Sequence, residues 1–415
     1  MISIIVLALV FLLIIVRRVG KYRFQIWQIM TLGAIAVLVT LQISPLRALK
    51  SINLDVVFFL FGMFTVGEAL EASGYLSYLS YKLFRRAKSL DSLVLFILFG
   101  MGLMSAFLMN DTLAIIGTPV VLLLARKADT SPKILLLALA FGITIGSATS
   151  PIGNPQNLLI AVNGNVANPF ITFFRYLLLP TLINLLMAYL LLRLFYRKQF
   201  NRAEIIDHPE PIKDPKLAYL SRVSLVLLFV LVLAKIIIVF AGLKIDFRLT
   251  YIALAAALPI ILFSPKRFTI IRKIDWSTLL FFAAMFILMA SVWNSGIFQK
   301  VINSTNLKLT SVPVIMGISI GLSQFISNVP LVALYLPMLM QMGVSNAGLM
   351  ALAAGSTIAG NFSILGAASN VIIIQNAEQK SKETLTFWEF VRIGVPLTII
   401  NILVYWLFFT ILSRR

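Results

Sequence analysis

Near its middle, the apolar segment 132–162 is interrupted by the polar stretch Ser150-Pro151-Ile152-Gly153-Asn154-Pro155-Gln156-Asn157. The two prolines and the glycine remove a regular hydrogen-bonding pattern from any helix that contains them. Within a bilayer, backbone groups freed in this way are tolerated only where protein or a water-filled cavity satisfies them. The stretch therefore predicts a broken helix that borders an internal site.

A second copy of this pattern follows in the other half of the chain. Residues 138–160 match residues 351–373 at a constant offset of 213, with 10 identities in 23 positions. The identities include Gly153/Gly366 and Asn157/Asn370, and glycines and asparagines in fixed register are more than shared apolar composition would produce. We therefore expect a second broken helix over 346–377, interrupted between Gly360 and Asn370.

Two longer apolar regions, 90–126 and 311–342, are related to each other at an offset of 218. Polar residues interrupt each near its middle, as Asn110-Asp111-Thr112 in the first and Ser327-Asn328-Val329-Pro330 in the second. Each region exceeds the roughly 20 residues of one span, yet neither holds a loop that would separate two spans. They are either kinked single spans or re-entrant hairpins that enter and leave on one face of the membrane.

The whole chain has the composition of a membrane protein. Of its 415 residues, 60% are hydrophobic and 12% are charged, whereas soluble domains carry about 25% charged residues. Besides the two broken helices, we expect spans at 2–16, 26–43, 54–72, 170–196, 221–241, 248–265, 276–294 and 386–412. We read 2–16 as a retained span because it lacks the charge pattern of a signal peptide.

The distribution of Lys and Arg favours the hairpins. With both regions as hairpins, most of the 35 basic residues fall on one side of the membrane, as the positive-inside rule requires. With both as single spans, the basic residues divide almost evenly. The sequence therefore predicts a multi-pass protein of the cell membrane with both termini outside and a cytoplasmic linker at 197–220.

These features define the domain organisation. We expect a first repeat at 1–196, the linker at 197–220 and a second repeat at 221–415, each repeat with five spans and one hairpin. Because five is odd, the second repeat would sit upside down relative to the first. The predicted fold class is thus an all-α polytopic membrane protein with an inverted repeat and discontinuous helices, as in many secondary transporters.

The composition also excludes several functions. The net charge of +20 reflects cytoplasmic loops that meet anionic lipid, and it does not indicate nucleic acid. The chain has no cysteine, a single histidine and no nucleotide-binding glycine loop, so we expect neither an enzyme nor a metal centre.

The motifs resemble those of the ion transporter superfamily over essentially the whole chain. Asn110-Asp111-Thr112 resembles the first hairpin of arsenite-efflux permeases, and Ser327-Asn328-Val329-Pro330 resembles a hairpin of the P-protein branch. Ile152–Asn157 and Ile364–Asn370 are similar to the two breaks of divalent anion:sodium symporters.

The resemblance implies a scaffold, a transport domain built from hairpins and broken helices, and a homodimer. It also implies that hairpin tips and breaks hold the substrate and any coupling ion. The candidate binding residues are Asn110, Asp111, Thr112, Gly153, Asn154, Pro155, Asn157, Ser327, Asn328, Val329, Gly366, Ala367, Ser369 and Asn370.

The leading hypothesis is a secondary active transporter for a small anion, either an inorganic or metalloid oxyanion or a carboxylate. A proton or sodium gradient would drive it, and Asp111 and Glu68 are the candidate proton carriers because acids within a membrane are usually functional. We expect no cofactor apart from a bound sodium ion if sodium is the coupling ion. The alternative is a cation/proton antiporter; a channel or scaffold fits the symmetric breaks less well.

Overall fold

The computed structural model describes residues 2–16, 18–19, 22–84, 87–166, 168–200, 212–240, 247–296, 309–325, 328–381 and 384–412. In this part of the chain all secondary-structure elements are helices except for one short antiparallel pair of strands, β1 (Arg18–Val19) and β2 (Tyr22–Arg23). Five helices are long and apolar enough to cross a membrane, or six if the bent pair at Pro45–Ser51 and Leu54–Ala72 is one span. The predicted class of all-α polytopic membrane protein is confirmed.

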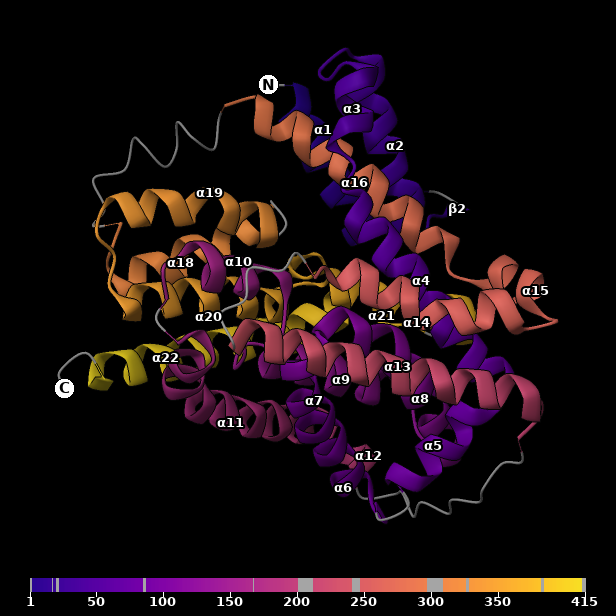
Figure 1. Ribbon diagram of the computed structural model, residues 1–415. Coiled ribbons are helices and arrows are strands. Elements are labelled where there is room, and N and C mark those ends of the chain that lie inside the picture. The colour runs from indigo at the N-terminus through magenta and orange to yellow at the C-terminus, as the bar shows by residue number, and fades with distance from the viewer. Residues whose placement is uncertain are drawn as a thin grey trace.

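One group of helices comes from the beginning of each half. From the first half it takes α1 (Ile2–Val16), α2 (Ile26–Val39), α3 (Pro45–Ser51) and α4 (Leu54–Ala72). From the second half it takes α13 (Pro215–Phe240), α14 (Leu249–Phe263), α15 (Arg267–Lys273) and α16 (Trp276–Asn294). Helices of the first half pack on helices of the second half: α4 packs on α14, and α2 packs on α16 (Figure 1).

Equivalent caps start the central helices of this group. The side chain of Asn53 accepts a hydrogen bond from the backbone nitrogen of Val56 at the start of α4, at 3.2 Å. Asp275 accepts in the same way from Thr278 at the start of α16, at 3.0 Å. Such caps satisfy backbone donors that the first helical turn leaves unpaired. They explain why α4 and α16 have the predicted bounds.

The region 90–126 folds back on itself. Its first arm comprises α6 (Leu90–Leu95), the π-helical turn η1 (Phe96–Met101) and α7 (Gly102–Leu108), and its second arm is α8 (Asn110–Lys127). The arms join at Met109, whose φ of +65° makes the sharp turn.

Contacts with α9 (Pro132–Ser147) give the direction of each arm. Gly142 and Gly146 of α9 approach Leu98 and Gly102, so the first arm runs parallel to α9. The second arm runs antiparallel to α9, because Gly117 meets Leu139 while the nitrogen of Asn110 donates to the carbonyl of Gly153 beyond the end of α9. The two arms are therefore antiparallel.

The region 311–342 has the same construction in its described part, with α18 (Val312–Ser323) and α19 (Asn328–Gln341) as arms. Gly355 of α20 (Asn346–Phe362) approaches the backbone of Met316, as Gly142 approaches Leu98 in the first half. The hydroxyl of Tyr335 in α19 donates to the carbonyl of Leu309, just before α18, at 3.0 Å. The second arm thus returns towards the start of the first.

The remaining helices complete the assembly. Beyond the breaks lie α10 (Pro155–Asn163) and, after the 3-10 turn η2 (Ile364–Gly366), α21 (Ala368–Ser381). The last long helices of the two halves, α11 (Pro169–Phe195) and α22 (Phe387–Leu412), pack on each other. The second arm of each hairpin packs on the helix beyond the break of the other half, α8 on α21 and α19 on α10.

Several predicted boundaries were wrong. The second break is shorter than expected, because α20 continues through Gly360 and Asn361 to Phe362, and Ala368, Ser369 and Asn370 already belong to α21. It contains no proline, so the helix can continue further than α9 does. The stretch 73–89, between the expected span 54–72 and the first hairpin, contains α5 (Tyr75–Phe84), for which no helix was predicted, and a short helix, α12 (Arg197–Phe200), begins the linker.

The described end of the linker is fixed to the α4 side of the protein. The backbone nitrogens of Lys213 and Asp214 donate to the carbonyl of Ser73, just after α4. Asp214 accepts from the nitrogen of Leu217 at 3.0 Å and pairs with Lys266 at 2.8 Å. The backbone hydrogen bond and the lysine lower the pKa of Asp214.

Candidate functional site

The first break is closed by one asparagine. Asn157, in the first turn of α10, donates from Nδ2 to the carbonyls of Ser147, Ala148 and Ser150, at 3.2, 3.3 and 3.0 Å. Its side chain is fully buried. The amide thus occupies carbonyls that α9 leaves unpaired where it ends, as buried backbone groups require.

The second break is closed in the same way. Asn370 donates from Nδ2 to the carbonyls of Gly360 and Ser363, at 2.5 and 3.4 Å, which are the positions equivalent to Ser147 and Ser150. A Cβ on Gly153 would lie 2.1 Å from the carbonyl oxygen of Ser147, and one on Gly366 would lie 2.3 Å from that of Ala359. Both breaks therefore require glycine for space.

The tip of the first hairpin meets both breaks. The backbone nitrogen of Asn110 donates to the carbonyl oxygen of Gly153 at 3.0 Å. Its side-chain Nδ2 donates to Oγ of Ser369, in the first turn of α21, at 3.4 Å. Asn110 and Thr112 are buried, and Asp111 beside them is half-buried. These contacts bring predicted residues from three separate segments together.

The second tip is described only in part. Ser327 lies outside the described residues, so its predicted role is not placed. Asn328 begins α19 and is buried, and its Oδ1 has no hydrogen-bond partner among the described residues. Val329 and Pro330 follow in the first turn of α19 and are half-buried.

Gln324 belongs to this site and was missed by the sequence analysis. Its Nε2 donates to the carbonyl oxygen of Ala359 at 2.9 Å, and its Oε1 accepts from Oγ of Ser363 at 2.8 Å. It thereby ties the end of α18 to the second break. A glutamine inside the apolar region 311–342 was the available signal, but its counterpart in the first half is Ala106, so repeat symmetry did not point to it.

One polar side chain that bonds across the first break has no counterpart at the second. Asn154 donates from Nδ2 to Ser147 Oγ and to Thr357 Oγ1, both at 3.1 Å, and Thr357 Oγ1 lies 3.4 Å from Oδ1 of Asn157. At the second break the position of Asn154 is taken by Ala367.

Among the described residues, several oxygens near the second break lack a donor, and two of them correspond to oxygens that are hydrogen-bonded at the first break. Thr144 Oγ1 and Asn370 Oδ1 are equivalent to Thr357 Oγ1 and Asn157 Oδ1, and both are buried without a hydrogen-bond partner in the described structure. Thr144 and Asn370 both adjoin Gly360. Buried oxygens without donors are unusual in folded proteins and call for an explanation, such as an unseen ion or water.

The contacts between α9 and α20 show that these two helices run antiparallel. Thr144 adjoins Gly360, whereas Asn154 joins Ser147 to Thr357. Moving forward along α9 therefore means moving backward along α20. This is the arrangement that repeats of opposite orientation would have.

Asp111 and Glu68, the two candidate proton carriers, lie in different settings. The carboxylate of Asp111 has no hydrogen-bond or ion-pair partner among the described residues, and its backbone nitrogen is held by Oδ1 of Asn110. Glu68, on α4, pairs with Lys380 of α21 at 3.3 Å, and Lys380 also pairs with Glu71. Glu68 thus shares Lys380 with Glu71, while Asp111 is the acid beside the tip of the first hairpin.

The site offers positive helix ends and neutral amides. The helices α8, α10 and α21 begin at Asn110, Pro155 and Ala368, and the contacts of Asn110 bring these three starts together. Helix N-termini carry partial positive charge and unpaired N–H groups, which suit an anion. A narrow cavity of about 30 Å³ adjoins the second break and is lined by Ser323, Gln324 and Gly366, among others.

Known proteins resemble this chain over most of its length. A family model described as citrate transporter matches residues 9–349. The 46 kDa membrane protein of Mycobacterium leprae is 26% identical, covering 87% of this chain and 88% of the relative. The silicon efflux transporter LSI3 of Oryza sativa subsp. japonica is 27% identical, covering 89% of each chain.

Two further matches are more distant. The P protein of Mus musculus is 25% identical over 92% of this chain and 58% of its own length. Among solved structures, the YdaH transporter of Alcanivorax borkumensis, whose crystal structure is described as revealing an unusual topology, is 14% identical with a TM-score of 0.48. It covers 99% of this chain and 97% of that one.

Proposed function

The chain belongs to the citrate transporter family and is a membrane transporter, and from this premise we propose that it moves a small anion by secondary active transport. A proton or sodium gradient drives the movement by alternating access. Several relatives are named as transporters, which agrees with a protein that is not an enzyme. The substrate class is an inorganic or metalloid oxyanion or a carboxylate.

One observation carries this proposal. Asn110 donates to Gly153 of one break and to Ser369 of the other, so one residue joins a hairpin tip to both broken helices. The three helix N-termini that meet there favour an anion, and amides and hydroxyls supply the direct contacts. A substrate held there would touch both repeats, which is what alternating access around a fixed site requires.

For proton coupling we propose Asp111 in preference to Glu68. An acid inside a membrane without a counter-charge is costly when ionised, so it readily exchanges a proton as its surroundings change. Asp111 meets this description, whereas Glu68 is paired with Lys380. In this proposal Glu68 joins α4 to α21 and carries no coupling proton.

For sodium coupling we propose a site at the second break. Thr144 Oγ1 and Asn370 Oδ1 supply neutral oxygens near Gly360, and hard cations bind oxygen ligands. If sodium is coupled to transport, this break holds it while the N-termini hold the anion.

We also propose the membrane orientation that the basic residues favour, with 197–220 cytoplasmic and both termini outside. Ion pairs agree with the sides that it gives to individual segments, since Lys133–Glu389 and Lys266–Asp214 each join two segments that this orientation places on the cytoplasmic side. Arg248–Asp55 joins two segments assigned to the outside. A homodimer in the membrane completes the proposal.

The test uses purified protein in proteoliposomes. Uptake of citrate, arsenite, phosphate and sulfate is measured under an imposed proton gradient, a sodium gradient or neither. We expect one of these anions to accumulate only when a gradient is present. If none is accumulated, and a sodium gradient alone moves protons, the protein is a cation/proton antiporter and the anion proposal is wrong.

A further inference from the structure

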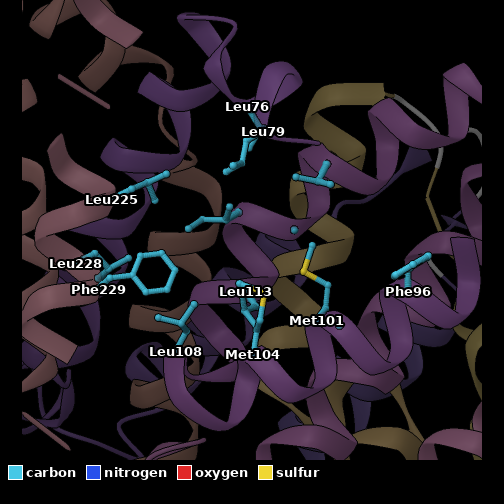
Figure 2. Close-up of a pocket in the computed structure, with 14 residues that line it drawn as sticks. Leu76, Leu79, Phe96, Met101, Met104, Leu108, Leu113, Leu225, Leu228 and Phe229 are labelled. Atoms are coloured by element: carbon cyan, nitrogen blue, oxygen red, sulfur yellow. The ribbon is translucent and has the colours of Figure 1, made fainter. Parts of the chain in front are cut away.

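A large apolar cavity lies beside the first hairpin, and none of the candidate binding residues lines it. It has a volume of about 280 Å³ and lies between the first hairpin, α5 and α13 (Figure 2). The ring of Phe229 points from α13 towards the hairpin arms, with Leu76 and Leu79 of α5 at one end. All of its lining residues are apolar or glycine.

The chemistry of the lining restricts what can fill the cavity. Water needs polar partners in a cavity, and this lining offers none from side chains. A cavity of about 150 Å³ lined by Leu, Ile and Phe stays dry and binds benzene, and this one is larger. If it stayed empty, its lining side chains would lose their dispersion contacts on that side. The occupant must therefore be a hydrocarbon group.

The cavity also has an open side. Phe96 and Phe229, on its rim, are 42% and 47% exposed. Gly100 lies on the same rim and has no atom within 4 Å of the place a Cβ would take. Gly100 belongs to the π-helical turn η1, and such turns are frequent at functional sites. The helical segments Leu90–Leu108 and Pro215–Lys235, which carry Phe96 and Phe229, are long and apolar enough to cross a membrane, so in a bilayer we expect this side to face the lipid tails.

We propose that this cavity binds a hydrocarbon chain of a membrane lipid, held between the first hairpin and α13. The chain would lie against Leu108 and Leu113, which flank the hairpin tip at Asn110. The same chemistry is present in a phospholipid acyl chain and in a free fatty acid. The bound chain would fill the gap between the hairpin and its neighbouring helices.

The experiment uses the full-length protein in liposomes with two probes, a phospholipid and a fatty acid, each with a diazirine near the end of its hydrocarbon chain. After illumination, crosslinked peptides are located by mass spectrometry. We expect crosslinks concentrated between residues 96 and 120 and between 225 and 229. The probe that gives them identifies whether the chain belongs to a phospholipid or to a free fatty acid.

Variants make the result specific. Gly100→Trp places a large side chain at the open rim, and Met104→Trp fills the interior, so both should lose the crosslinks. Gly317→Trp is the matched control, because Gly317 is an exposed glycine of the second hairpin with open space at its Cβ and lies outside this cavity. Size-exclusion profiles report whether each variant is folded.

The outcomes separate the possibilities. Loss in the two cavity variants with retention in Gly317→Trp supports the proposal. Crosslinks spread evenly over the membrane surface, or unchanged in both folded cavity variants, overturn it. A second copy of the chain is the other possible occupant. If the wild type gives no lipid crosslinks, and a bifunctional crosslinker joins two copies of the chain through residues 96–120, a second copy fills the cavity. That result would also overturn the proposal.

Discussion

Asn110 and Ser369 are 259 positions apart in the sequence, yet Nδ2 of Asn110 lies 3.4 Å from Oγ of Ser369. Asn110 forms the tip of the first hairpin, and Ser369 lies in the first turn beyond the second break. The backbone of Asn110 is at the same time bonded to Gly153 of the first break. Because one residue connects all three segments, they should move as a unit during transport.

The first prediction concerns the asparagines at the two tips. Asn110→Ala and Asn328→Ala should each lower transport by about 10- to 100-fold, because each removes a buried amide that can donate a hydrogen bond to a bound ligand and accept one from it. Uptake into proteoliposomes measures the effect. Ser369→Ala should be milder than Asn110→Ala, since its contact is long and Oδ1 of Asn110 keeps its hydrogen bond from the backbone nitrogen of Asp111.

Protein yield and size-exclusion profiles of these variants should match the wild type. If both asparagine variants are folded and transport normally, the tips are structural turns and the substrate binds elsewhere.

A second prediction concerns the glycines of the breaks. Gly153→Ala and Gly366→Ala should each destabilise the protein by about 1–3 kcal/mol, because the new Cβ would overlap a backbone carbonyl that cannot move freely. Thermal unfolding in detergent measures the loss. Gly317→Ala, with open space at its Cβ, is the control and should be nearly neutral. Equal melting temperatures for all three variants would contradict the close approach.

The sequence predicted the repeat and the breaks for identifiable reasons. Gly153/Gly366 and Asn157/Asn370 recur in fixed register because each break needs a glycine for space and an amide to bind the carbonyls of the interrupted helix. Such requirements act locally, so they are visible in a single chain. The bounds of α4 and α16 could also be predicted, since capping residues directly precede apolar runs.

Other features depend on contacts that a sequence does not display. The partnership of Asn110 with Ser369 depends on how α8 packs on α21, a helix from the other repeat. The pairing of Glu68 with Lys380 has the same origin, and it changes the role assigned to that acid. Gln324 was overlooked because Ala106 replaces it in the first repeat. The helix α5 was missed because its sequence is too polar for a span.

A third prediction tests the contact between α4 and α21. Lys380→Met should destabilise the protein by about 1–3 kcal/mol, because it leaves Glu68, whose side chain is 14% exposed, without its partner. Lys133→Met removes a more exposed pair with Glu389 and should cost under about 1 kcal/mol. Thermal unfolding compares the two. Adding Glu68→Gln to Lys380→Met should recover part of the loss, and no recovery would argue against the pairing.

A fourth prediction concerns membrane orientation. The chain contains no cysteine, so single cysteines can be introduced without background labelling. Cysteines at Ser89 and Lys127, which flank the first hairpin, should react with a membrane-impermeant reagent from the cytoplasmic side. Cysteines at Ser311 and Ser345, which flank the second, should react from outside. If the two cysteines of either pair react from opposite sides, the region between them is a membrane span and not a hairpin.

The last prediction is that Asp111 carries the coupling proton. Its carboxylate lies in the first turn of α8, where the helix dipole favours the charged form and the membrane interior opposes it. The balance between these two effects changes when the site is exposed first to one side of the membrane and then to the other. Asp111 would take up a proton in one state and release it in the other.

Asp111→Asn keeps the size and the hydrogen-bonding capacity of the side chain but cannot exchange a proton. The variant should still bind substrate and exchange it across the membrane, with a rate that no longer depends on pH. It should fail to accumulate substrate when only a pH gradient is imposed. Glu68→Gln is the matched control, since it neutralises an acid that is already paired with Lys380, and it should keep the pH dependence. If Asp111→Asn accumulates substrate with the wild-type pH profile while Glu68→Gln does not, the assignments of the two acids must be exchanged.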